Sequence, residues 1–170
     1  MVNSSSTSTF SIEKVNEEAL SLLSELLQTV AKALEHKGQT LWTQESLEPS
    51  ALTEAYPNAD MYLALQDGNA VGGMVIVNDD PHFWPEIPVG ESLFIHKLAV
   101  LPEAQGGGIA SRLLSFAQSE AQRQDRRYLR LDCAAERPGL CRFYEGQGFT
   151  YVGERTVGSF FAALFERVVV

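Results

Sequence analysis

Apolar residues recur along the first part of the chain with two spacings. Residues 10–15 alternate between apolar and polar, which predicts a short strand. Leucines at helical spacing from Leu20 to Leu34 predict a helix, with Asn16 as the N-cap and Gly38 at the end. A second, shorter helix is predicted over residues 45–55, because Pro49 lies near its start and a further proline follows its end.

The rest of the chain alternates strands with helices. Two alternating runs over residues 60–77 flank the tight-turn sequence Asp67-Gly68-Asn69 and predict a hairpin. A proline-containing loop, 78–90, precedes a predicted strand at 91–100. A helix at 108–123, a strand at 128–133 and a short helix at 140–147 follow, and residues 150–170 are predicted to form two strands. The order β-α-α-β-β-β-α-β-α-β-β predicts an α/β fold, a mixed sheet with helices on both faces.

Length and composition are those of one globular domain of 170 residues. We expect a disordered polar leader over residues 1–9 and a single domain over 10–170. The net charge of −9 argues against a nucleic-acid partner and suits a cationic substrate. No apolar run is long enough for a membrane span. Since no secretory signal precedes them, the two cysteines, Cys133 and Cys141, are expected to be reduced thiols in the cytoplasm.

A glycine-rich loop lies between a predicted strand and a predicted helix. It consists of Gln105, Gly106, Gly107, Gly108, Ile109 and Ala110. The N–H groups of a first helical turn attract phosphate oxygens, and glycine lets the backbone approach a ligand closely. A P-loop would need Gly-Lys-Ser/Thr, which is absent, and a dinucleotide fingerprint would need glycine at Ser111. The third pattern, Gln/Arg-x-x-Gly-x-Gly/Ala, belongs to coenzyme A binding, and it is satisfied here. A plain glycine-rich turn is the structural alternative.

A second motif, Phe143-Tyr144-Glu145-Gly146-Gln147-Gly148-Phe149, follows the next predicted strand. Together with the strand Leu98-Ala99-Val100 and the glycine-rich loop, it resembles the GNAT superfamily of N-acetyltransferases, the GCN5-related type. The resemblance covers residues 91–153 well, while the N-terminal half matches only in the order of its elements. It implies the acyl-CoA N-acyltransferase fold, with central strands that splay apart.

The resemblance also implies roles for particular residues. The pantetheine arm of coenzyme A would bond to backbone groups of Leu98, Ala99 and Val100, and one N–H of this strand would polarise the thioester carbonyl. The pyrophosphate would lie on the glycine-rich loop, with Ser111 close to the phosphates. Tyr144 would be the general acid that protonates the leaving thiolate. The structural alternative for Tyr144 is a core tyrosine with its hydroxyl bonded to water.

The acceptor amine must also lose a proton before it attacks. His96, in the sequence His-x-Leu-Ala-Val, is similar to the strand histidine of arylalkylamine N-acetyltransferases that assists deprotonation. The alternatives are Glu91, a water molecule, or a histidine that only fills space in the sheet. Many members of the family have an asparagine where this chain has Arg137, which would then reach a phosphate of the coenzyme or point to solvent.

Other candidates come from the composition of loops and helix ends. Four residues are apolar enough to line an acceptor pocket: Trp42, Phe83, Trp84 and Phe160. The run Arg123, Arg126, Arg127 and Arg130 is expected to be a solvated helix end. The resemblance implies acetyl transfer from acetyl-CoA to a primary amine by direct attack, without a metal; members are often dimers, so a homodimer is one expectation. The opposing hypothesis is an acyl-CoA sensor that keeps the fold without turnover.

Overall fold

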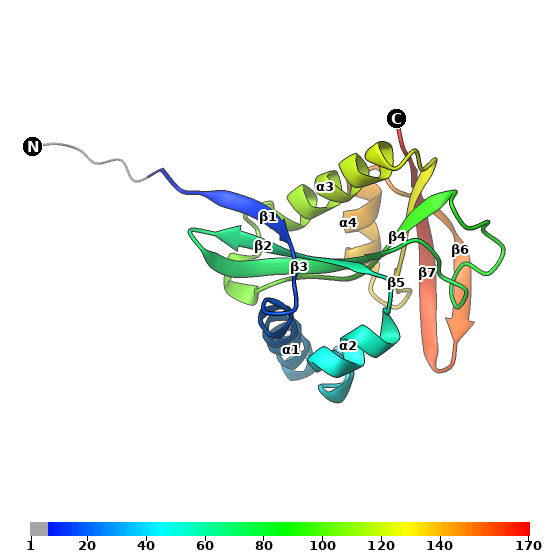
Figure 1. The fold of residues 1–170 in the computed structure, drawn as a ribbon. Helices are drawn as coiled ribbons and strands as arrows, with labels where there is room; N and C mark the ends of the chain where they lie inside the picture. The colour runs from blue at the N-terminus through cyan, green and yellow to red at the C-terminus, as the bar shows by residue number, and fades with distance from the viewer. Residues whose placement is uncertain (1–6) are drawn as a thin grey trace, which may run out of the picture. The chain divides into compact units, whose positions relative to one another are not determined.

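The computed structural model describes residues 7–170, so most of the predicted leader lies outside the described residues. The seven strands form one mixed sheet with hydrogen-bonded neighbours in the order β1-β2-β3-β4-β5-β7-β6 (Figure 1). The elements are β1 (Phe10–Lys14), α1 (Leu20–His36), η1 (Glu45–Leu47), α2 (Pro49–Ala55), β2 (Asp60–Gln66), β3 (Asn69–Val77), β4 (Ser92–Val100), η2 (Pro102–Ala104), α3 (Ile109–Arg123), β5 (Tyr128–Ala134), α4 (Pro138–Gly146), β6 (Thr150–Val157) and β7 (Phe160–Val168). The predicted element order and fold class are confirmed.

The described residues divide into two compact units, and each is described by itself. Unit 1 holds residues 7–57, 61–74 and 98–113. Its strands β1 and β2 pair antiparallel, with Phe10 opposite Gln66 and Lys14 opposite Tyr62. The hairpin between β2 and β3 turns at Asp67 and Gly68, both with positive φ, which is the turn geometry that matches the twist of paired strands.

Two adjacent glycines of β3 allow close packing in unit 1. A Cβ on Gly72 would lie 3.0 Å from the Ala99 carbonyl oxygen and 3.1 Å from Ile109 Cγ2, at the start of α3. A Cβ on Gly73 would lie 2.6 Å from Leu23 Cδ1, on α1. Successive strand residues point to opposite faces. The glycine pair therefore lets α1 and the start of α3 approach the two faces of the same strand.

Unit 2 holds residues 58–60, 75–97 and 114–170. Its strands β4 and β5 are parallel, whereas β7 pairs antiparallel with both β5 and β6. One face of this sheet is covered by α4 and the end of α3, since Tyr144 contacts Phe165 and Arg167 donates to the Leu114 carbonyl oxygen. We call it the helix face.

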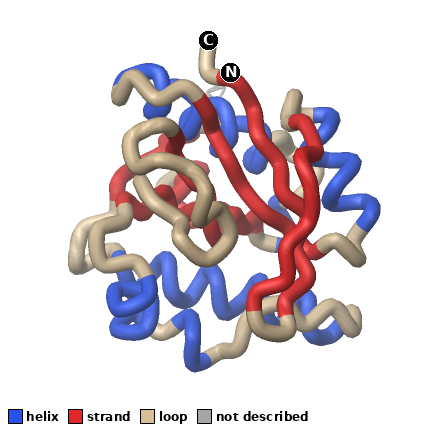
Figure 2. Tube along the Cα trace, turned by 90° about the vertical axis from the view of Figure 1, so that its right-hand side faces the viewer, coloured by secondary structure: helices blue, strands red, loops and turns tan. Residues whose placement is uncertain are grey.

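The opposite face of unit 2 is covered by the loop of residues 78–90, which Figure 2 draws in tan. Trp84 of this loop packs with Phe94, Ala162 and Leu164 in a buried cluster. We call this side the loop face. Among the described residues, no helix is both long and apolar enough to cross a bilayer.

Local details differ from the sequence predictions for physical reasons. Asn16 is not the helix N-cap: its side-chain oxygen accepts the Ala19 N–H at 2.9 Å, which closes a turn before α1 begins at Leu20. The predicted helix over 45–55 is interrupted at Glu48, which is extended because it precedes Pro49. Gly38, with φ of 71°, follows the end of α1 as predicted.

Candidate active site

The parallel strands β4 and β5 stop pairing before either strand ends. Their paired residues run from Ser92 and Tyr128 to Ile95 and Leu131, although both strands continue beyond. Two residues past the last pair, Lys97 has φ of 53°, an uncommon conformation for a residue with a side chain. We call the region beyond Ile95 and Leu131 the β4–β5 gap. It agrees with the splayed central strands that the family resemblance implies.

Side chains from both faces of unit 2 surround this gap. Phe94 and Arg130 both contact Trp84 on the loop face. Side chains two residues apart on a strand point to the same face, so His96 and Asp132 also point to the loop face. Cys133 lies next to Asp132 and contacts Cys141 of α4, on the helix face. Tyr144 is on the same helix and packs on Phe165. The predicted base therefore lies on the loop face of unit 2 and the predicted acid on its helix face.

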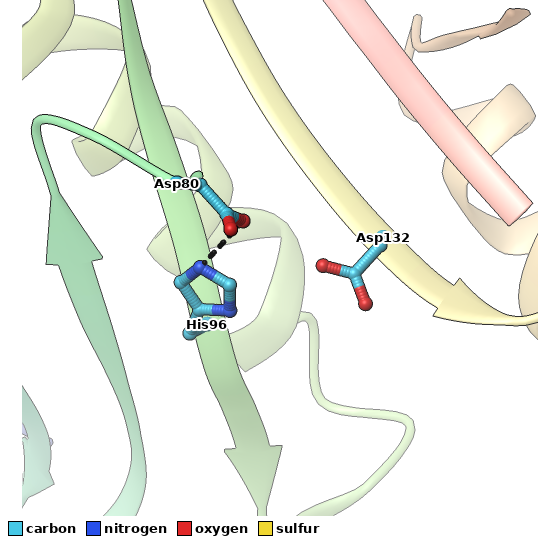
Figure 3. A group of neighbouring side chains, drawn as sticks. All are labelled: Asp80, His96 and Asp132. Carbon is cyan, nitrogen blue, oxygen red and sulfur yellow. Dashed lines mark ion pairs between the residues drawn. The ribbon is translucent and has the colours of Figure 1, made fainter. Parts of the chain in front are cut away.

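On the loop face, three side chains form a polar cluster: Asp80, His96 and Asp132 (Figure 3). One atom from each lies within 4.8 Å of the others. His96 Nε2 is 3.1 Å from Asp80 Oδ2, an ion pair in which the ring N–H is not well aligned, since this buried oxygen has no well-formed hydrogen bond. Asp132 extends from β5 toward β4 across the gap.

The two carboxyl groups have different protonation properties. Burial alone would raise the pKa of Asp80, but His96 and the backbone N–H groups of Phe83 and His82 hold it below its ordinary value. Burial raises the pKa of Asp132 to about 6, even though His96 and Lys97 oppose the rise. Asp80 is thus ionised at neutral pH, whereas Asp132 changes its protonation state close to neutral pH. Two carboxyl groups with pKa values shifted in opposite directions are typical of acid–base sites.

Lys97 adds a fourth titratable group to this region. Burial lowers its pKa to about 8, against the attraction of Asp132. Two carboxylates and an imidazole are also the ligand types that bind divalent cations. The shifted pKa values of Asp132 and Lys97 beside an imidazole favour a proton-handling role for this set of residues.

Tyr144 is buried, with 6% of its surface exposed, among the rings of Phe143, Phe149 and Phe165. Burial raises the pKa of its phenol well above the ordinary value, with Cys133 and Asp132 adding to the rise. The hydroxyl therefore keeps its proton at neutral pH, as a general acid must.

The glycine-rich loop belongs to unit 1 and has the conformation that its glycines permit. Gly106 and Gly108 have φ of 85° and 81°, where a side chain would be strained, and neither would bring a Cβ within 4 Å of a neighbour. Gln105 Nε2 donates to the Val100 carbonyl oxygen at 3.3 Å, which ties the loop to the end of β4. Helix α3 begins at Ile109, so its first N–H groups, Ser111 included, lie directly after the loop.

Some predicted candidates take part in packing and in ion pairs. Trp84 is a core residue, 3% exposed, and Phe83 packs edge-on against Phe160 with ring centroids 5.9 Å apart. Arg130 is not part of a solvated helix end; it is buried and pairs with Glu91 at 3.3 Å and Glu166 at 2.8 Å. This pairing gives Glu91 a structural role in unit 2.

Arg137 precedes α4, and its carbonyl oxygen accepts the N–H groups of Leu140 and Cys141. Its positive charge lies close enough to Tyr144 and Cys133 to lower their pKa values, against the larger effect of burial. The structure thus brings Arg137 near the helix-face part of the site.

Sequence reasoning missed Asp80, Asp132 and Lys97. Charged residues inside the apolar strands β4 and β5 were a usable signal for Lys97 and Asp132, because strand interiors seldom bury charge without a reason. Asp80 carries no such signal, since an aspartate before a proline is ordinary in a loop. Only the folding of the loop onto the sheet brings it to His96.

Comparison with known proteins adds to this geometry. A family model described as acetyltransferase (GNAT) family matches residues 25–149. The uncharacterized N-acetyltransferase YesJ of Bacillus subtilis is 25% identical over 151 residues, 85% of this chain and 83% of that protein. The aminoalkylphosphonate N-acetyltransferase of Salmonella typhimurium is 33% identical over 93 residues, 55% of this chain and 58% of that protein.

Solved structures share the fold at low sequence identity. A GNAT-family acetyltransferase from Listeria monocytogenes superposes with a TM-score of 0.76 at 17% identity, covering 94% of both chains. The putative acetyltransferase yncA of Salmonella typhimurium, solved with acetyl-CoA, gives a TM-score of 0.69 at 15% identity, over 95% of this chain and 94% of that one.

Proposed function

This chain belongs to the acetyltransferase (GNAT) family, and from that premise we propose that it transfers an acetyl group from acetyl-CoA to a primary amine. The amine would attack the thioester directly in a ternary complex, without an acyl-enzyme intermediate. The observation that carries the proposal is the position of two candidate proton-transfer groups on opposite faces of the unit 2 sheet. His96 lies on the loop face and Tyr144 on the helix face.

The proposed reaction balances as follows. His96 removes one proton from the acceptor ammonium and later releases it to solvent. The neutral nitrogen then forms a bond to the thioester carbon, and the carbon–sulfur bond breaks. Tyr144 gives its proton to the departing thiolate, and the second proton lost by nitrogen restores the phenol. Acid–base groups of this kind each contribute about 10²–10⁴ in rate.

Acetyl-CoA is the proposed co-substrate, and the fold neighbours solved with acetyl-CoA support this choice. The backbone of Leu98, Ala99 and Val100 would bind the pantetheine arm. The glycine-rich loop, with Ser111 beside it, would bind the pyrophosphate, and its positive-φ glycines support a close backbone approach. Arg137 is the further candidate for a coenzyme contact. We propose no metal for the reaction.

A small amine is the acceptor class that we favour. The Salmonella relative is named for an aminoalkylphosphonate, which carries a primary amine on a short chain. The acidic balance of this chain, with 22 acidic against 13 basic residues, suits an acceptor that is a cation. A cytoplasmic location, expected from the sequence, is part of the proposal.

The test is to mix purified protein, acetyl-CoA and one amine at a time, and to follow the release of coenzyme A thiol and the mass of the product. The amines are 2-aminoethylphosphonate, polyamines, aminoglycosides, arylalkylamines and peptide N-termini. We expect at least one amine to accelerate thiol release and to gain one acetyl group. Tight acetyl-CoA binding without acceleration by any amine would favour the sensor hypothesis instead.

A further inference from the structure

The loop of residues 78–90 holds Asp80 in a fixed position on the loop face. Its side chain is buried, with 4% exposed. Asp80 Oδ1 accepts the Phe83 N–H at 3.1 Å, and its backbone oxygen accepts the Trp84 N–H at 2.9 Å. Trp84 anchors the same turn in the core cluster with Phe94. The second carboxylate oxygen, Oδ2, is thereby directed at His96, and a buried carboxylate needs such a partner to offset its lost hydration.

The contact with Asp80 determines which ring nitrogen of His96 handles protons. Nε2 forms an ion pair with the Asp80 carboxylate at 3.1 Å, and a carboxylate accepts hydrogen bonds, so we infer that the neutral imidazole carries its proton on Nε2. Its lone pair is then on Nδ1. In Figure 3, Nδ1 lies on the side of the ring away from Asp80, toward the strand that carries Asp132. The pKa of Asp80 is held low, so its carboxylate stays ionised through the neutral range.

Asp132 supplies the opposite wall of the same small region. Its carboxylate points from β5 toward His96, and its atom nearest the cluster lies within 4.8 Å of the other two groups. Asp80 from the loop forms an ion pair with His96, and Asp132 from β5 interacts electrostatically with both His96 and Lys97 of β4. The Asp132 carboxylate beside an imidazole fits an ammonium ion, which donates up to three hydrogen bonds.

We propose, on the basis of the function proposed above, that Asp80 is a positioning residue that holds His96 with Nδ1 as the proton acceptor, and that Asp132 binds the acceptor's ammonium group. The ammonium gives one proton to Nδ1 and becomes the attacking amine. Asp80 never touches the substrate. It fixes the ring orientation and stabilises the imidazolium that forms.

The first experiment reads the His96 ring in the resting protein, before any turnover. Nitrogen-15 NMR of the imidazole separates the two neutral tautomers. We expect the Nε2–H tautomer in the wild type, loss of that preference in Asp80→Asn, and no change in Asp79→Asn. Asp79 is the matched control, because it is the exposed neighbour with the same charge. The proposal would be overturned by a wild-type ring with its proton on Nδ1, or by a tautomer preference that is unchanged in Asp80→Asn.

The second experiment measures turnover with acetyl-CoA and the best amine from the panel. Asp80→Asn should lower kcat/KM about 10- to 100-fold and move the acidic limb of the pH–rate profile to lower pH, with KM for acetyl-CoA unchanged. Asp80→Glu, which keeps the carboxylate, should recover part of the loss. Asp132→Asn should raise KM for the amine at least tenfold. Asp80→Asn with activity within twofold and an unchanged profile would overturn the positioning role.

Two further outcomes separate this proposal from the proposed function. A wild type that acetylates no amine would overturn the proposed function, and with it the role of Asp80 in turnover, even if NMR confirmed the tautomer. Activity that EDTA abolishes and Zn²⁺ restores in the wild type, but not in Asp80→Asn, would assign the three side chains to a metal and overturn the ammonium site.

Discussion

At the scale of single residues, Tyr144 combines burial with chemistry. Its ring packs against Phe149 and Phe165, and burial keeps its phenol protonated. The raised pKa makes the phenol a weaker acid than an ordinary tyrosine, but it keeps on the oxygen the proton that a leaving thiolate needs. The residue can therefore be changed in two separable ways, by removing the hydroxyl or by removing the ring.

The first prediction concerns the hydroxyl alone. Tyr144→Phe should lower kcat about 10- to 100-fold, because the proton for the leaving thiolate is lost while the packing of the ring remains. Affinity for acetyl-CoA, measured by calorimetry, should stay within twofold. The matched control is Tyr151→Phe on β6, an exposed tyrosine that contacts the same Phe165. Full activity in Tyr144→Phe would remove the acid role.

Asp132 gives a prediction on stability. Its pKa rises from 3.8 to about 6 on burial, so the folded chain binds a proton that the unfolded chain releases. Stability relative to Asp132→Asn is therefore greatest below about pH 4 and falls as pH rises through about 6. We expect Asp132→Asn to match the wild type near pH 4 and to exceed it by about 3 kcal/mol at pH 8, by urea unfolding.

The exposed Asp79 serves again as the control, and Asp79→Asn should not reproduce this growing difference. An Asp132→Asn gain that is the same at both pH values would show that packing, and not charge burial, is the cause. A stability gain that accompanies a loss of amine binding would mark Asp132 as a residue kept for function.

At the scale of elements, the sequence predicts most of the fold because period and turn chemistry agree along the chain. Local sequence determines three of these features: the end of the helix before Gly38, the hairpin at Asp67-Gly68 and the strand before the glycine-rich loop. The break at Glu48 and the late start of α1 depend on one or two residues, where prediction is least certain.

The candidate site was only half visible in the sequence for a related reason. Tyr144 and the glycine-rich loop lie in contiguous motifs. The cluster of Asp80, His96 and Asp132 joins a loop and two strands, which only tertiary packing brings together. Burial of Arg130 between Glu91 and Glu166 is equally non-local, so a run of arginines misleadingly predicts a solvated surface.

The glycine-rich loop gives a prediction at this scale. Gly108→Ala should raise KM for acetyl-CoA about tenfold, because Gly108 has φ of 81° and alanine would shift the backbone that approaches the phosphates. The control is Gly38→Ala, after α1, with φ of 71° and equally open space around it. Both variants should lose about 1 kcal/mol of stability, by thermal unfolding. An equal KM in both would argue against phosphate binding at this loop.

At the scale of the whole molecule, charge is the property that the sequence alone establishes. Acidic residues exceed basic ones by 22 to 13. A negative surface raises the local concentration of cations, and salt screens it: the Debye length falls from about 30 Å at 0.01 M to about 3 Å at 1 M ionic strength. The effect depends on the charge of the acceptor and not on the shape of its binding site.

The corresponding prediction compares two acceptors. Between about 0.01 and 1 M salt, kcat/KM for a polyamine should fall several-fold, whereas kcat/KM for zwitterionic 2-aminoethylphosphonate should change less. The comparison uses initial rates at saturating acetyl-CoA. Parallel salt dependence for both acceptors would place the effect on the anionic coenzyme and would contradict electrostatic attraction of the amine.

The glycine pair of β3 has a consequence for any survey of sequence variants. Gly72 and Gly73 carry no charge, no functional group and no proposed role in catalysis, yet a Cβ on either would press on neighbours at 3.0 Å or closer. In a deep mutational scan, both positions should tolerate almost no substitution, as severely as His96 or Tyr144. A ranking by intolerance alone would therefore place these two packing glycines among the catalytic candidates. A measurement of folded protein abundance would separate the glycines from the catalytic candidates, because only the glycine variants should lower it.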